Sequence, residues 1–263
     1  MIPYTPKETY TIDDLCELVT LLRRPDGCPW DKVQTHTSLR SDLIEETYEV
    51  IEAIDRDDPK MMREELGDLL LQVVFHARLE EEQGRSTFSD IVTDVCAKLV
   101  ERHPHVFSTT NAETTEEALA SWESVKTKSK GQTTVTETLE EVAKPLPALM
   151  RAQKVRKRAA KSDMPALEKD ALLAQMQDSL SALQAAAQAD DKDAATKALG
   201  SLFFCGAGVA SAMGLEAEQS LTDTTNAFIS QFSAFEDNAA EKPLNTVTRA
   251  DWQAQEETEH AAG

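Results

Sequence analysis

Apolar positions recur at helical spacing along most of this sequence. Between residues 39 and 54 they fall at positions 39, 43, 44, 50, 51 and 54, the i, i+3, i+4, i+7 pattern of a helix with one buried face. Asp57-Asp58-Pro59 interrupts the pattern and predicts a turn into a second helix, residues 60–82, whose centre is strongly apolar. Gly84 suits the position that ends such a helix. The pattern therefore predicts two long helices joined by a short turn.

A third helix is predicted over residues 89–102, with Ser89 as its N-cap, and His103-Pro104 ends it. Residues 127–136 are polar and predict a linker, whereas the alanine-rich stretch 182–195 favours helix again. The chain has 9 glycines and 10 prolines, and 5% of its residues are aromatic. So few turn formers and aromatics argue against a sandwich or barrel of short strands. The expected fold class is all-α, with tandem bundles built on a four-helix-type core.

Two stretches far apart in the chain resemble each other. Leu66-Gly67-Asp68-Leu69-Leu70 is similar to Leu199-Gly200-Ser201-Leu202-Phe203. Trp122 lies 55 residues after Gly67, and Trp252 lies 52 residues after Gly200. These matching offsets predict an internal duplication of one helical unit.

The charge of the chain restricts its partners. There are 47 acidic and 27 basic residues, which gives a formal net charge of −20. This disfavours nonspecific binding to nucleic acid or to anionic membranes, although bound cations would still allow a small phosphorylated substrate. We find no signal peptide and no apolar run of 18 residues, and the four cysteines lack paired spacing. The expected location is the cytoplasm, with reduced thiols.

Acidic residues on the first two predicted helices form two pairs at i, i+3. Glu46 and Glu49 share one face of the first helix, and Glu65 and Asp68 share one face of the second. Two antiparallel helices would bring these four carboxylates together, and such a cluster needs a cation to stay ionised. Oxygen-only ligation suits Mg²⁺, with Mn²⁺ as a substitute. The alternative is a solvated acidic surface, which is the usual role of acidic residues on helices.

The same residues carry a family resemblance. Glu45-Glu46-x-x-Glu49 followed by Glu65-x-x-Asp68 resembles the signature of the all-α nucleoside triphosphate pyrophosphohydrolases, and the first half of the chain resembles the MazG family in particular. The resemblance covers roughly residues 10–160 closely and the remainder weakly. The matching stretches are residues 28–36, 38–39, 64–76, 98, 102–107, 122–126 and 146–154.

The resemblance implies a helical bundle that assembles as a homodimer or a higher homo-oligomer. It implies hydrolysis of nucleoside triphosphates, ribo or deoxy, between the α and β phosphates, in nucleotide-pool housecleaning or an alarmone-linked stress role. By the family pattern, Mg²⁺ is held by Glu46, Glu49, Glu65 and Asp68. Glu45 either supports the metal ligands or orients the attacking water. The resemblance implies a catalytic domain over residues 10–126, a linker over residues 127–143, and a degenerate second domain over residues 144–255.

Two further groups complete the expected site. Lys98 and Arg102, at i, i+4 on the third helix, would contact the triphosphate or the charge that develops on pyrophosphate, unless they are simply solvated. A loop before the metal-binding helices offers one aromatic and several polar side chains to bind the nucleotide, namely Trp30, Lys32, Gln34 and His36. The alternative for this loop is a structural plug, with Trp30 buried under the bundle.

The second half departs from the family pattern. Aligning Gly67 with Gly200 places Ala198 opposite Glu65 and Ser201 opposite Asp68, and only Asp178 remains acidic opposite residues 45–49. Ala227 and Gln231 fall opposite Lys98 and Arg102. We expect a degenerate copy kept for packing or dimerisation. A non-catalytic nucleotide-binding module is therefore the main alternative function. A di-iron bundle is disfavoured, because its only Glu-x-x-His spacing is Glu257 to His260.

Overall fold

The computed structural model describes residues 2–108, 112–129, 133–160 and 168–238. Within these ranges the chain forms eleven α-helices and one short 3-10 helix, and no strand, so the all-α prediction is confirmed. The chain divides into two compact units, residues 1–130 and 131–263. This division falls inside the segment predicted as a linker.

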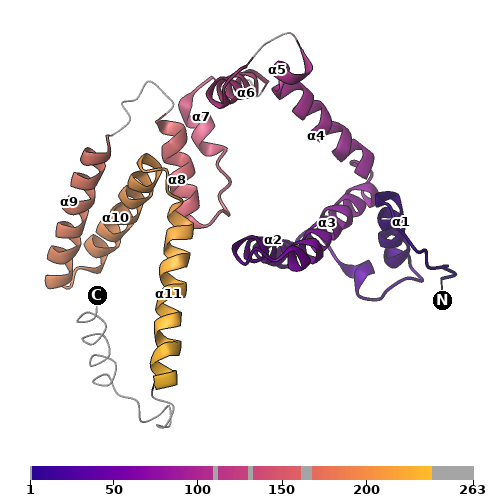
Figure 1. The fold of residues 1–263 in the computed structure, drawn as a ribbon, viewed down its shortest axis with the longest axis horizontal. Coiled ribbons are helices and arrows are strands. Elements are labelled where there is room, and N and C mark those ends of the chain that lie inside the picture. The colour runs from indigo at the N-terminus through magenta and orange to yellow at the C-terminus, as the bar shows by residue number, and fades with distance from the viewer. Residues whose placement is uncertain (1, 109–111, 130–132, 161–167, 239–263) are drawn as a thin grey trace. The chain divides into compact units, whose positions relative to one another are not determined.

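In the first unit a short N-terminal helix packs on one helix of a helical hairpin, and the later helices lead away from the hairpin (Figure 1). Its elements in chain order are α1 (Ile12–Arg23), η1 (Asp31–Val33), α2 (Arg40–Asp55), α3 (Pro59–Glu82), α4 (Phe88–Arg102), α5 (Pro104–Phe107) and α6 (Thr115–Ser129).

The hairpin of α2 and α3 follows the predicted boundaries within one residue. Asp57 turns the chain with a left-handed φ of 49°. Asp58 caps α3, since its Oδ1 accepts hydrogen bonds from the backbone N–H of Lys60 at 2.9 Å and of Met61 at 3.1 Å. Pro59 occupies the first helical position, where its missing N–H costs nothing. Gly84 follows the end of α3 with φ 65°, as predicted.

The hydrophobic core of the first unit lies on the second half of α3. Val19 of α1 packs there with Leu39, Val74, Phe75 and Leu79, all of them buried. The first half of α3 is more open, because α1 does not cover it. The first half of α3, which carries the predicted metal ligands Glu65 and Asp68, therefore stays accessible, while the second half anchors the helix in the core.

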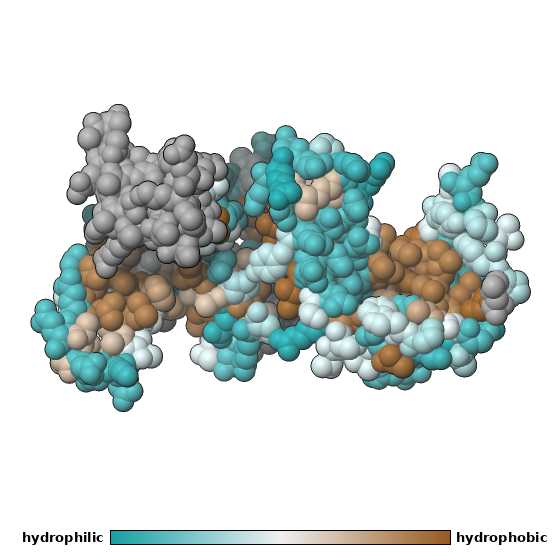
Figure 2. Space-filling model, turned by 90° about the horizontal axis from the view of Figure 1, so that it is seen from below, coloured by the Kyte–Doolittle hydropathy of each residue, from teal (hydrophilic) through white to brown (hydrophobic). Residues whose placement is uncertain are grey.

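Helix α4 leads away from α2 and α3 (Figure 1). Its N-cap is Thr87, whose hydroxyl accepts from Asp90 N while the Asp90 carboxylate accepts from Thr87 N, so the predicted cap at Ser89 is wrong. One apolar stripe of α4 is exposed, formed by Val92, Val95, Leu99 and Val100. Figure 2 shows apolar side chains gathered over parts of the visible surface. So much exposed apolar area is typical of a surface that another chain covers.

The second unit contains α7 (Val135–Glu140), α8 (Ala148–Ala159), α9 (Lys169–Gln188), α10 (Lys192–Ala212) and α11 (Ala217–Asn238). Helix α7 lies within the segment predicted as a linker. No single helix of the described ranges is long and apolar enough to cross a bilayer, and α10 with the first part of α11 reaches that length only as a pair bent by 105°. Trp252 and the pair Glu257 and His260 lie outside the described residues.

The turn before α10 repeats the turn before α3. Asp190 has a left-handed φ of 52°, and Asp191 caps α10 by accepting from the backbone N–H of Asp193 and Ala194. Each capping aspartate stands nine residues before the glycine of its Leu-Gly pair, Gly67 or Gly200. A left-handed aspartate followed by a capping aspartate, at matching positions, supports the predicted duplication.

Candidate metal centre

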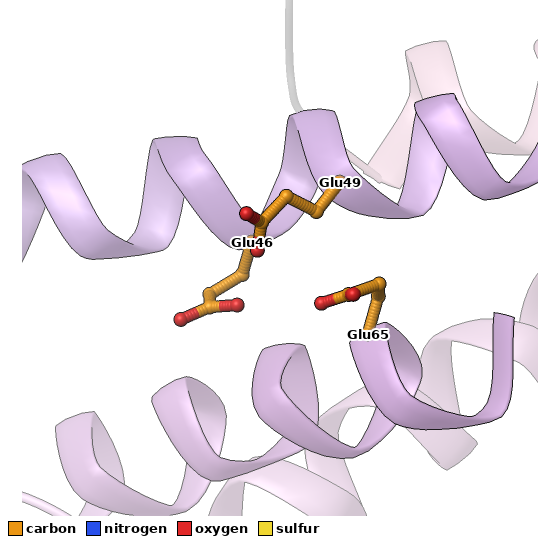
Figure 3. A group of neighbouring side chains, drawn as sticks. All are labelled: Glu46, Glu49 and Glu65. Carbon is orange, nitrogen blue, oxygen red and sulfur yellow. The ribbon is translucent and has the colours of Figure 1, made fainter. Parts of the chain in front are cut away.

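Three glutamates of the hairpin converge. Glu46 and Glu49 of α2 and Glu65 of α3 each offer a carboxylate oxygen, and the three oxygens lie within 4.8 Å of one another. Figure 3 shows Glu65 extending across the gap between the helices toward the two glutamates of α2. The i, i+3 spacing on α2 and the tight turn at Asp57 together produce this arrangement. Among the described residues, this is the one group of three or more potential metal ligands.

Within the described part of the chain, no protein cation forms an ion pair with this cluster. Burial, followed by the charges of Asp68, Glu49 and Glu65, raises the pKa of Glu46 above its ordinary value. Burial, followed by Glu49, also raises the pKa of Glu65. None of the ion pairs found in the described ranges involves these carboxylates. A hard divalent cation fits this oxygen-only donor set and would remove the repulsion.

Asp68 and Glu45 stand beside the cluster. Asp68 lies one turn after Glu65 on α3, close enough that its charge raises the pKa of both Glu46 and Glu65. Its oxygens fall outside the group of three, so Asp68 stays a predicted ligand. Glu45 is exposed on α2, next to Glu46.

The predicted basic pair belongs to a second cluster, on α4 and α6. The guanidinium carbon of Arg102 lies 5.3 Å from the ring centroid of Trp122, and Lys126 Nζ lies 4.7 Å from the same ring. Arg102 Nε is buried and has no hydrogen-bond partner among the described residues. The predicted site residues did not include Trp122 and Lys126, although they lie in a family-like segment at i, i+4 spacing. Lys98 is exposed one turn before Arg102.

The two clusters lie apart within the first unit. Helix α4 carries Lys98 and Arg102 away from the hairpin, toward α5 and α6 (Figure 1). The structure therefore brings the glutamates together and brings Arg102 together with Trp122, but it does not bring the acidic cluster to the basic one.

The predicted nucleotide-binding loop displays its aromatic side chain. Trp30 is 57% exposed, so the alternative of a plug buried under the bundle is wrong. Lys32 is exposed and donates to the carbonyl oxygen of Pro25 at 3.3 Å. Arg23 of α1 holds the loop by donating to the carbonyl oxygens of Asp31 at 2.6 Å and of Gln34 at 3.2 Å. The backbone of the loop is thus held by Arg23, while the side chain of Trp30 stays exposed.

Gln34 and His36 make contacts within the protein. Gln34 Nε2 donates to the carbonyl oxygen of Trp30 at 3.1 Å, and Gln34 Oε1 accepts from the Ser38 hydroxyl at 2.6 Å. His36 pairs with His76 of α3. In this arrangement both side chains shape the loop, and their contact with a nucleotide stays a prediction.

Comparison with known proteins decides the family. Residues 34–107 match the model of the MazG nucleotide pyrophosphohydrolase domain. Over 249 residues the chain is 37% identical to a nucleoside triphosphate pyrophosphohydrolase of Escherichia coli K12, covering 94% of both proteins. The chain belongs to the MazG family.

Two other relatives show how far this similarity extends. A protein of Thermotoga maritima named nucleoside triphosphate pyrophosphohydrolase/pyrophosphatase MazG is 33% identical over 225 residues, which is 86% of this chain and 85% of that relative. A nucleoside triphosphate pyrophosphohydrolase of Mycobacterium tuberculosis is 43% identical over 140 residues, 52% of this chain and 42% of the relative. Similarity to MazG proteins thus extends beyond the first unit.

The second unit of this MazG protein offers no comparable group of acids among its described residues. Ala198, opposite Glu65, is buried on α10, and Ser201, opposite Asp68, is exposed. Asp178 of α9 is an isolated exposed carboxylate. Arg156 of α8 covers Gly208 and lies on the ring of Phe204, 4.6 Å from its centroid. Packing interactions therefore occupy the face of α10 around Gly208.

Proposed function

We propose that the first unit of this chain hydrolyses nucleoside triphosphates to nucleoside monophosphate and pyrophosphate. The observation that carries the proposal is the convergence of Glu46, Glu49 and Glu65 in a chain of the MazG family. Two relatives similar over most of this chain are named for this activity. Glu46, Glu49 and Glu65, together with the predicted ligand Asp68, would hold a magnesium ion that also binds substrate phosphates.

The chemistry is a displacement at the α-phosphorus. A water oxygen forms a bond to that phosphorus, the bond to the oxygen bridging the α and β phosphates breaks, and pyrophosphate departs. Bound Mg²⁺ supplies charge neutralisation and a more acidic water. Glu46, Glu49, Glu65 and Asp68 would hold it, and Glu45 would orient the attacking water. Lys98 and Arg102 would stabilise the charge on pyrophosphate.

The separation of the two clusters supports a homodimer. Arg102 of one copy would reach the acidic cluster of another copy if α4 packed on a neighbouring hairpin. Exposed apolar side chains on both surfaces favour such packing: Val92, Val95 and Leu99 on α4, with Ile44, Tyr48, Leu66 and Leu70 on the hairpin. A symmetric pair of chains would then form two equal sites.

The decisive assay offers a panel of ribo- and deoxynucleoside triphosphates with Mg²⁺ and measures pyrophosphate against orthophosphate. We expect pyrophosphate as the first product, and loss of turnover in Glu46→Gln and Asp68→Asn at unchanged helical content. Orthophosphate as the first product contradicts cleavage at the α–β bond. Full turnover in both variants contradicts the assigned site.

A mixing experiment tests the shared site. Glu46→Gln and Arg102→Ala chains are each expected to be inactive alone. Random exchange of subunits makes half of the dimers mixed, each with one intact site, so about a quarter of the wild-type activity should return. A monomer by light scattering, or no recovery despite proven subunit exchange, contradicts the shared site.

One observation favours a different class of function. Among its described residues the second unit has no group of acids comparable to that of the first. A first unit that had lost only turnover would likewise bind nucleotide without cleaving it. Calorimetry with a nucleoside triphosphate and Mg²⁺, combined with product analysis over hours, separates the two. Tight binding without any product would favour the binding module.

A further inference from the structure

A pair of histidines joins the loop that displays Trp30 to helix α3. His36 Nδ1 and His76 Nδ1 are 2.7 Å apart, and the two rings are parallel within 1° with centroids 5.0 Å apart. The two nitrogens can share one hydrogen, because two would collide at this distance. One ring therefore donates and the other accepts.

The pair continues into an ionic group. His36 Nε2 lies 2.8 Å from Glu80 Oε1. Arg85 Nε donates to Glu80 Oε2 at 2.7 Å, and a second nitrogen of Arg85 donates to Oε1. Arg85, followed by His36, lowers the pKa of Glu80 to about 2. Glu80 is thus a carboxylate at working pH, and its charge is already paired with a guanidinium.

These contacts assign the hydrogens. His36 Nε2 lies 2.8 Å from Glu80 Oε1 and 3.4 Å from a guanidinium nitrogen of Arg85, so the shorter contact, with the carboxylate, places a hydrogen on Nε2. This leaves His36 Nδ1 as an acceptor in the neutral ring. His76 then donates from Nδ1, and His76 Nε2 is a bare nitrogen. That nitrogen is buried and has no hydrogen-bond partner among the described residues. The whole group, Arg85 to His76, is neutral in this state.

An added proton always reaches the same buried atom. If it binds His76, it lies on Nε2. If it binds His36 at Nδ1, the shared bond reverses, and the hydrogen of His76 moves to Nε2. Either way the hydrogen lies on a buried nitrogen that has no hydrogen-bond partner among the described residues, and the group gains a positive charge. Consistently, burial, followed by the charge of His36 and opposed by Glu80, lowers the pKa of His76.

The charged groups beside the start of the loop are paired with one another. On the side of α1, Arg23 is bound to Glu82, whose pKa that guanidinium lowers, and Arg78 pairs with the same carboxylate. Arg23 fixes the start of the loop through Asp31 and Gln34, whereas the end of the loop is held on α3 by His36, through both His76 and Glu80.

We propose that His76 is a positioning residue, which holds the loop of residues 30–36 on α3 through its hydrogen bond to His36 and releases the loop when the pair gains a proton. The loop carries Trp30, and α3 carries Glu65 and Asp68. The hydrogen bond between the two histidines thereby fixes the position of the proposed nucleotide-binding loop relative to the acidic cluster. The effect of the histidine pair on nucleotide binding rests on the proposed function, but the release of the loop on protonation does not.

Two substitutions separate hydrogen bonding from titration. In His76→Asn the side-chain amide donates as Nδ1–H does, but it binds no proton. In His76→Phe the ring remains and the donor is lost. Hydrogen exchange of residues 30–36, expressed as protection factors to remove the intrinsic effect of pH, reports on the loop directly.

In the wild type, protection of the loop should fall about tenfold between pH 7.5 and pH 5.5. His76→Asn should stay protected at both pH values, and His76→Phe should be poorly protected at both. The proposal is overturned if wild-type protection is constant with pH, or if His76→Phe is protected as well as the wild type. His36→Phe removes the same bond from the loop side, should His76→Phe not fold.

Steady-state kinetics provide the functional readout. His76→Phe should raise KM several-fold with kcat changed less than twofold, and His76→Asn should restore KM. Equal losses in kcat for both variants would contradict a positioning role. If the wild type turns over no nucleotide, the proposed function fails, whereas the exchange experiment still decides whether the pair holds the loop.

Discussion

Arg102 lies against the ring of Trp122, with its guanidinium carbon 5.3 Å from the ring centroid, and Lys126 approaches the same ring. Two cations at one indole repel each other, and the attraction of each cation to the π system of the ring offsets part of this repulsion. Arg102 Nε is buried without a hydrogen-bond partner in the described ranges. In a chain with a net charge of −20, this concentration of positive charge is suited to an anion.

Arg102→Gln should lower kcat/KM about 100-fold, which is the usual loss when one charge-stabilising donor is removed. The glutamine keeps a polar side chain of similar length but loses the guanidinium. Arg56→Gln is the matched control, because Arg56 is an exposed arginine whose ion pair in the described part of the chain is with Glu52, one turn earlier. The measurement is steady-state release of pyrophosphate. Equal activities for the two variants would contradict a role for Arg102 in binding the triphosphate.

Metal-free stability should depend on pH through the glutamate cluster. The pKa values of Glu46 and Glu65 are raised in the folded state, so their contribution is complete below the ordinary value near 4.5 and is lost as pH rises through the raised values. Mg²⁺ should reverse this loss. The rise in Tm caused by Mg²⁺ should therefore be larger at pH 7.5 than at pH 5.

Glu46→Gln checks the cause of that dependence. It removes one of the repelling charges, so it should raise the metal-free Tm at pH 7.5 and reduce the response to Mg²⁺. Glu52→Gln, on the same helix, loses only its exposed pair with Arg56 and should keep the full response. A smaller Mg²⁺ effect at pH 7.5 than at pH 5 would rule out the cluster as the metal site.

Local signals predicted the hairpin well. Three signals set the bounds of these helices: the apolar spacing between residues 39 and 82, the helix breaker Pro59, and the glycine at position 84. Each signal depends only on residues close to it in the sequence, so it can be read without knowledge of the tertiary structure. The Thr87 cap was missed because Thr87 and Ser89 are both good caps, and only the reciprocal bond from Asp90 decides between them.

Tertiary relationships were harder to predict. The i, i+3 spacing places Glu46 with Glu49, and one short turn adds Glu65, so this cluster was predictable. His36 and His76 are 40 residues apart in the sequence, and His36 lies on a loop. Apolar periodicity predicts helices and strands but not the path of a loop, so this contact could not be predicted from the sequence. The contact of Arg102 with Trp122 likewise depends on the chain between α4 and α6.

Trp30→Ala should weaken nucleotide binding more than it weakens folding. Trp30 is mostly exposed, so its loss should change the free energy of unfolding by less than about 1 kcal/mol. If the indole stacks on the base, KM should rise about tenfold, since such stacking contributes about 1–3 kcal/mol. Val33→Ala, on an even more exposed residue of the same loop, is the control. A large loss of Tm with unchanged KM would mean that Trp30 serves only the fold.

The same chemical change in each unit tests whether only the first unit is catalytic. Asp68→Asn removes a charge that acts on Glu46 and Glu65, and turnover should fall at least about 100-fold. Asp178→Asn removes an exposed carboxylate of α9, and turnover should stay within twofold, because Asp178 belongs to no group of three or more potential metal ligands among the described residues. Both variants should keep the helical content of the wild type by circular dichroism. If Asp178→Asn abolished turnover and Asp68→Asn did not, the catalytic site would belong to the second unit, and the glutamates of the hairpin would be a solvated surface.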